Sequence, residues 1–118
     1  MYREYLGENY HWEVRKILGV KDNLCTDTII DADLNVGAMK MIMKQQLTNP
    51  SRIKTEQQYQ QVAKAAQYYL SGIICLALKS RTAVPPYNSS TYRKDWDTLR
   101  QKCMSKGASI IQKAMLMG

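Results

Sequence analysis

The feature that most constrains the fold is a long run of residues between two helix-breaking stretches, TNPS at 48–51 and AVPPYNSS at 83–90. Thr55 can cap a helix at the start of this run, and Gln58 can complete a capping box. Apolar side chains then recur at alternating steps of three and four, the spacing of one helix face: Tyr59, Val62, Ala66, Tyr69, Ile73 and Leu76. After Tyr68 the run is apolar nearly all round, which predicts a central, buried helix.

A second helix is predicted before it, from about Thr28 to Leu47. Thr26, Asp27 and Thr28 are all N-cap residue types, and Thr28 with Asp31 resembles a capping box. After these residues, Ile30, Leu34, Gly37 and Met41 follow one another at steps of four, three and four, which places them on one face of a helix. The two stripes together give the predicted core: Ile30, Leu34, Met41, Val62, Ala66, Tyr69, Ile73 and Leu76.

The two ends of the chain also have helical patterns. A short helix is predicted from about Asn9 to Leu18, with Gly19 as its C-terminal stop. After the linker at 83–90, a helix over 91–118 is predicted from the stripe Trp96, Leu99, Cys103, Gly107, Ile110, Ala114 and Met117.

The sequence therefore predicts an all-α fold, a small bundle of three main helices plus a short N-terminal helix. We expect one domain over 1–118, with a helical core at 1–82 and an extended, proline-containing linker before the C-terminal helix.

The net charge of +7 lies mainly in the second half of the chain. Residues 51–82 have five basic and one acidic residue, and residues 83–118 have six and two. Such a basic half indicates an acidic partner, either nucleic acid or protein, or else a solvated helix face. The expected contacts with a partner or with DNA in a channel are Arg93, Lys94, Arg100, Lys102 and Lys106.

The segment DADLNVG at 31–37 begins like a calcium-binding loop. An EF-hand needs Gly at position 6 and a bidentate Glu at position 12, but counting from Asp31 these positions are Val36 and Ile42. We therefore expect no calcium binding. Asp31 and Asp33 instead suit the first turns of a helix, where negative charge meets the positive end of the helix dipole.

Residues that could support catalysis are few and scattered. His11 is the one histidine, and Cys25, Cys75 and Cys103 occur singly, without the ligand spacing of a structural zinc site. The sequence lacks the spacing of a phosphate-binding loop. We expect no enzyme activity, no cofactor and no metal, with the cysteines reduced. The longest apolar patch, at 73–78, is too short to span a bilayer, so we expect no membrane association.

The order of the predicted helices and breaks along the chain resembles that in the head–tail connector proteins of tailed bacteriophages, also called head-completion or adaptor proteins. The resemblance covers roughly residues 12–80. Its first part is carried by Val14-Arg15, Leu18-Gly19, Asp27, Ile30, Leu34, Gly37-Ala38 and Met41. Its second part is carried by Ala65, Ala66, Tyr68, Tyr69 and Leu70. The C-terminal helix departs from the family pattern.

This resemblance implies a non-enzymatic virion protein made in the bacterial host cytoplasm. It implies a ring, typically of twelve subunits, that binds beneath the portal protein and continues the DNA channel toward the tail. A tail-side connector or tail-completion protein would then be a further partner, with non-specific contact to double-stranded DNA in the channel.

Two other functions remain open from the residues alone. One is a small helical DNA-binding regulator, although the stretch TNPSRIKT is too loose and proline-interrupted for a helix-turn-helix. The other is a generic helical module that meets one protein partner.

Overall fold

The computed structural model describes residues 6–7, 9–20, 27–31, 54–85 and 87–116. In chain order its elements are α1 (Tyr10–Leu18), a helical segment at 27–31, α4 (Glu56–Arg81), the 3-10 helix η3 (Ser90–Tyr92) and α5 (Trp96–Leu116). The protein is all-α, as predicted, and the described ranges contain no strand. The predicted core residues Leu34 and Met41, and also Gly37, lie outside the described residues.

The central helix α4 begins where the sequence predicts. Thr55 Oγ1 accepts a 3.0 Å hydrogen bond from the backbone N–H of Gln58, and Gln58 Oε1 accepts a 3.1 Å bond from the backbone N–H of Thr55. These two bonds form the predicted capping box. The helix then continues for 26 residues, and every residue from Tyr69 to Cys75 is buried. Burial all round this stretch identifies α4 as the central packing element.

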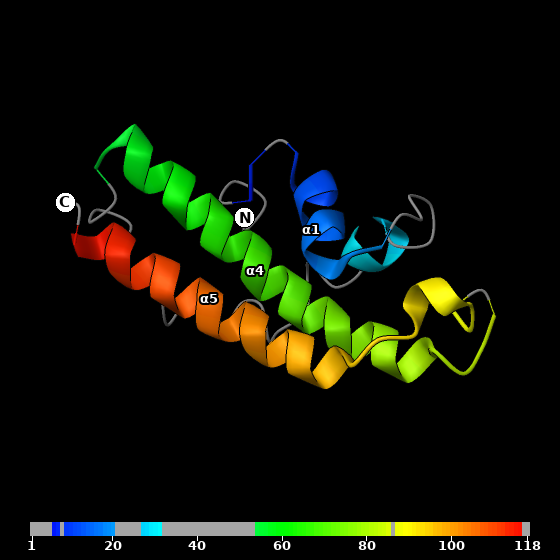
Figure 1. Ribbon diagram of the computed structural model, residues 1–118. Helices are drawn as coiled ribbons and strands as arrows, with labels where there is room; N and C mark the ends of the chain where they lie inside the picture. The colour runs from blue at the N-terminus through cyan, green and yellow to red at the C-terminus, as the bar shows by residue number, and fades with distance from the viewer. Residues whose placement is uncertain (1–5, 8, 21–26, 32–53, 86, 117–118) are drawn as a thin grey trace.

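Helix α5 runs antiparallel to α4, and the two form a long hairpin (Figure 1). At one end of the hairpin, Gln58 of α4 is hydrogen-bonded to Ala114 of α5. At the other end, Lys79 of α4 forms an ion pair with Asp97 of α5, with a distance of 2.6 Å between Nζ and Oδ2. The C-terminal helix is thus part of the same hydrophobic core as α1 and α4, to which it contributes Trp96, Ile110, Ile111 and Ala114.

Two glycines let the hairpin helices approach closely. A Cβ added to Gly107 of α5 would lie 2.9 Å from Cε1 of Tyr69 on α4. A Cβ added to Gly72 of α4 would lie 2.8 Å from Cε of Met104 on α5. Both distances are shorter than van der Waals contact. Helices α4 and α5 can therefore lie this close together because these two positions have no side chain.

The structure confirms most of the predicted core residues that it describes. Five of them are buried, namely Ile30, Val62, Ala66, Tyr69 and Ile73. The prediction for Leu76 is wrong, because this side chain is 49% exposed. At this end of α4 the contacts with α5 come from Gly72, Cys75 and Lys79. Leu76 lies one turn beyond Gly72 on the same side of α4, so its exposure means that the cover α5 gives at Gly72 does not extend to Leu76.

Helix α1 packs against α4 and ends as the sequence predicts. Its buried residues Tyr10, Val14 and Leu18 follow one face at a spacing of four. Gly19 has a φ of 70° at the C-cap, and its N–H donates back to the carbonyl of Arg15. This left-handed conformation strains any residue that has a Cβ, so glycine is the residue type suited to the stop.

Polar contacts join α1 to the helical segment at 27–31. Asp31 Oδ1 accepts a 3.2 Å hydrogen bond from the Tyr10 hydroxyl and lies 2.8 Å from Nε2 of His11. Arg15 forms an ion pair with Asp27. Thr28 lies inside the helical segment and not before it, so the predicted capping box of Thr28 and Asp31 is wrong. Asp31 instead holds α1 against this segment.

Helix α5 begins five residues later than the predicted start at residue 91. The residues from Ser90 to Tyr92 form η3, and Asp95 then caps α5. Its carboxylate accepts hydrogen bonds from the backbone N–H of Thr98 at 3.1 Å and from the Thr98 hydroxyl at 2.7 Å. These bonds hold the pKa of Asp95 below its ordinary value. The bonds to Thr98 therefore fix the start of α5 at Trp96.

Candidate interaction surface on α5

The outer face of α5 is a continuous polar surface. Its inner face is buried against α4 through Trp96, Cys103, Gly107, Ile110, Ile111 and Ala114. The residues that line a shallow depression on the outer side are all exposed: Thr98, Gln101, Lys102, Ser105, Lys106 and Ser109. Their spacing of three and four residues places them on one side of the helix. The contact with α4 thus fixes which residues α5 presents to solvent.

This surface is basic and contains no acidic residue. From Thr98 to Leu116 the sequence has no Asp or Glu and four basic residues, Arg100, Lys102, Lys106 and Lys113. The three lysines are exposed, and none of them forms an ion pair within the described part of the chain. Their charges are therefore available to an acidic partner, and they are spread along the helix instead of gathered at one point.

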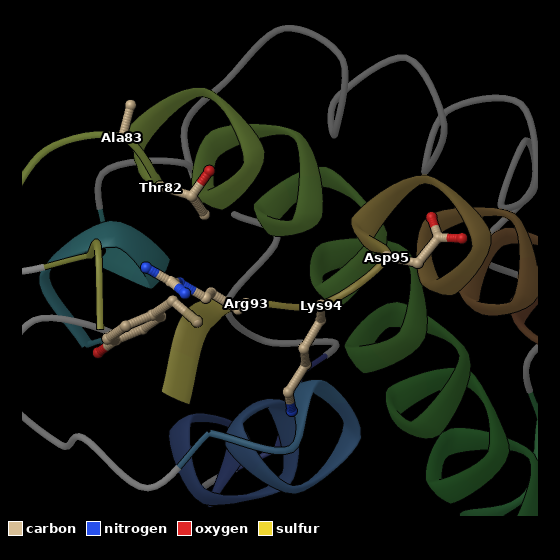
Figure 2. A pocket seen from close by; sticks show the side chains of 6 residues that line it. Thr82, Ala83, Arg93, Lys94 and Asp95 are labelled. Carbon is tan, nitrogen blue, oxygen red and sulfur yellow. The ribbon is translucent and has the colours of Figure 1, made fainter. Parts of the chain in front are cut away.

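Arg93 and Lys94 lie before α5, and their side chains diverge (Figure 2). They line a recess together with Thr82, Ala83, Tyr92 and Asp95. Lys94 Nζ donates a 2.8 Å hydrogen bond to the carbonyl oxygen of Leu18 and a second bond to that of Gly19. Lys94 thus binds the C-terminal carbonyls of α1, where a positive charge is favourable. Burial lowers the pKa of its ammonium group.

Arg100 also differs from a freely exposed base. It is partly buried, and its Nε has no hydrogen-bond partner within the described residues. It lies close enough to Cys75 for its positive charge to favour the thiolate of that cysteine. Arg100 is thus oriented in part toward the α4–α5 contact.

The five basic residues predicted from the sequence therefore fall into distinct places. Lys102 and Lys106 share the outer face of α5, Arg93 is exposed beside the recess before the helix, and Lys94 is bound to α1. Their role in binding a partner stays a prediction. Sequence reasoning did not separate Lys94 from the others, because its partners lie 75 and 76 residues away in the chain.

Sequence reasoning also missed two contacts between α4 and α5. The sequence places Gln58 in a local capping box, but its side chain also donates a hydrogen bond to the carbonyl oxygen of Ala114. The sequence gives Cys75 and Cys103 as separate thiols, but both are buried and close enough to shift each other's pKa. The sequence does place Cys103 on the apolar face of its helix, which indicates that this thiol is buried. It does not indicate that Cys75 lies opposite, because that depends on how α4 and α5 are aligned along each other.

The described residues give two further observations on chemistry. Across the described ranges, no group of three or more His, Cys, Asp or Glu side chains is arranged to hold a metal ion. The helices in the same part of the chain include none with the length and apolar content needed to cross a membrane.

No protein-family model, curated protein or solved structure matches this chain.

Proposed function

We propose that this protein is a non-enzymatic structural subunit of a head–tail connector in a tailed bacteriophage. In this role, copies of the chain assemble as a ring beneath the portal and continue the DNA channel toward the tail. The observation that carries the proposal is the fixed basic face of α5, which presents Lys102 and Lys106 among small neutral residues and without an acid. The resemblance of residues 12–80 to connector proteins supplies the class of assembly.

The outer face of α5 suits docking because the helix is already ordered. Its inner face is buried from Trp96 to Ala114, so a partner does not have to order this backbone on binding. The exposed lysines would meet acidic groups on the portal or on a neighbouring subunit, and Arg93 would extend the contact before the start of the helix. Complementary charge of this kind favours correct encounter and register.

Dispersed lysines are also compatible with a channel through which DNA passes. Contacts with phosphates position DNA without reading its sequence, and their strength falls as the salt concentration rises. A surface with separated lysines and small hydroxyl residues would hold DNA weakly. This property favours passage of the duplex, whereas a site for a particular DNA sequence would need a set of side chains reaching base edges.

The proposal can be tested with the purified chain and the portal protein of the same phage. Negative-stain electron microscopy should show added density beneath portal rings when both are mixed. The double variant Lys102→Glu/Lys106→Glu should weaken this association by roughly tenfold or more, because it places like charges against an acidic surface. The matched control is Lys64→Glu/Arg81→Glu, which makes the same change in net charge at exposed positions of α4.

Three outcomes distinguish the functions. Loss of binding in the α5 variant alone supports the connector and its docking face. Equal loss in both variants would mean that net charge matters and the location of the lysines does not. Failure of the unaltered chain to bind portal, together with salt-dependent retardation of duplex DNA, would replace the connector with a DNA-binding protein.

A further inference from the structure

The contact between α4 and α5 encloses two buried thiols, one on each helix. Cys75 on α4 is 1% exposed and Cys103 on α5 is 2% exposed, and both are free cysteines. Each thiol shifts the pKa of the other, so the two side chains lie within interaction distance across the hairpin. The helices approach closely at this level, since a Cβ added to Gly72 would lie 3.5 Å from the Cβ of Cys103. Gly72 precedes Cys75 by three residues, nearly one turn, so both face α5.

The two thiols differ in acidity because each affects the ionisation of the other. Interaction with the Cys75 thiol stabilises the thiolate of Cys103 and lowers the pKa of Cys103. Interaction with Cys103, together with burial, raises the pKa of Cys75. Cys103 therefore forms the thiolate more readily than Cys75, and its attack on an external disulfide requires local opening of the hairpin because both thiols are buried. Cys75 is then placed to attack Cys103 in a second step.

We propose that Cys75 and Cys103 are a redox-active pair that forms a disulfide between α4 and α5 when the protein enters oxidising surroundings. This disulfide would cross-link the two helices that make up most of the core. The segment between the two cysteines, which contains the linker and η3, would then form a covalently closed loop. The inference rests on the packing of the hairpin and does not depend on the proposed connector function.

The reaction requires a low-molecular-weight disulfide as oxidant. The thiolate of Cys103 attacks one sulfur of this disulfide, forming a mixed disulfide and releasing one thiolate. The sulfur of Cys75 then attacks the sulfur of Cys103, the S–S bond between the cysteines forms, and the second small thiolate leaves. The proton of Cys75 passes to that leaving thiolate. Two protein thiols are oxidised and one small disulfide is reduced to two thiols.

The test uses the full-length chain incubated with oxidised glutathione. Remaining thiols are alkylated before trypsin digestion, which cleaves after lysine and places the three cysteines in the separate peptides 22–40, 65–79 and 103–106. The expected product is peptide 65–79 joined to peptide 103–106, with Cys25 alkylated. The oxidised protein should unfold at a temperature about 10 °C higher than the reduced protein, because the cross-link restricts the unfolded chain.

Two variants control the result. Cys103→Ser should abolish both the joined peptide and the rise in unfolding temperature, whereas Cys25→Ser should retain both. The proposal is overturned if peptides 65–79 and 103–106 are recovered unjoined after prolonged oxidation. It is equally overturned if either cysteine pairs with Cys25, or if glutathione remains attached to Cys103 without release.

Discussion

Gln58 satisfies backbone groups at the termini of two helices at once. Its side-chain Oε1 accepts hydrogen bonds from the N–H groups of Lys54 and Thr55, just before α4. Its Nε2 donates a 3.0 Å hydrogen bond to the carbonyl oxygen of Ala114, in the last turn of α5. Carbonyls in a last turn have no partner within their own helix, so this buried amide links the start of α4 to the end of α5.

Replacing Gln58 by Leu keeps the approximate shape of the side chain but removes both sets of hydrogen bonds. We expect the free energy of unfolding to fall by about 2–3 kcal/mol, since the N-cap loses one acceptor and a buried carbonyl loses its donor. Denaturant unfolding followed by circular dichroism measures this loss. The matched control is Gln57→Leu at the neighbouring exposed position, and an equal loss in that variant would contradict the assigned role of Gln58.

The two hairpin glycines should respond differently to alanine. At Gly107 the new Cβ would lie 2.9–3.1 Å from three atoms of the Tyr69 ring, which is rigid and buried. We expect Gly107→Ala to lower the free energy of unfolding by about 1–3 kcal/mol through overpacking. At Gly72 the closest atom is the terminal methyl of Met104, which can rotate away.

Gly72→Ala should therefore be close to neutral, because the greater helix propensity of alanine, worth about 1 kcal/mol, offsets the movement of Met104. Thermal unfolding of the two single variants measures the difference. If Gly72→Ala were the more damaging substitution, the Met104 side chain would not be the mobile neighbour that the packing indicates.

The features that sequence reasoning predicted correctly are local ones. The Thr55–Gln58 capping box and the stop at Gly19 depend on residues within a few positions of each other, and both are present. Helical spacing likewise predicted a buried stripe on α5, and its members Trp96, Cys103, Gly107, Ile110 and Ala114 are buried. Such features follow from the geometry of a single helix, before any tertiary contact is known.

The features that it missed depend on how the helices pack. Asp31 resembles a helix-start carboxylate in the sequence, but its partner His11 lies 20 residues earlier. The exposure of Leu76 depends on the line that α5 follows along α4. Periodicity places a residue on a helix face, but it does not say where the covering helix crosses that face.

The buried hydroxyl of Tyr69 makes stability sensitive to alkaline pH. Burial raises the pKa of Tyr69 above its ordinary value of 10.0, so the side chain remains neutral in the folded state where the unfolded chain ionises. Above pH 10.0 the unfolded state binds fewer protons, and the free energy of unfolding should fall as the pH rises.

Tyr69→Phe should reduce this alkaline loss. It should also raise stability at neutral pH by about 1 kcal/mol, because the hydroxyl has no hydrogen-bond partner among the described residues. Denaturant unfolding at pH values below and above 10.0 measures both effects. The control is Tyr59→Phe at a position that is 48% exposed, where neither effect is expected. A destabilised Tyr69→Phe protein at neutral pH would mean that the hydroxyl is hydrogen-bonded after all.

Lys94 should stabilise α1 and its contact with the linker before α5. In Lys94→Met the carbonyls of Leu18 and Gly19 lose their donor, so we expect faster hydrogen exchange in α1 and a loss of about 1–2 kcal/mol in the free energy of unfolding. Exchange in the middle of α4 and α5 should change less, since their contacts are retained. Arg93→Met removes the same charge one residue earlier, at an exposed side chain, and should leave α1 protected. If the two variants expose α1 equally, then charge near the linker stabilises this helix and the hydrogen bonds of Lys94 do not.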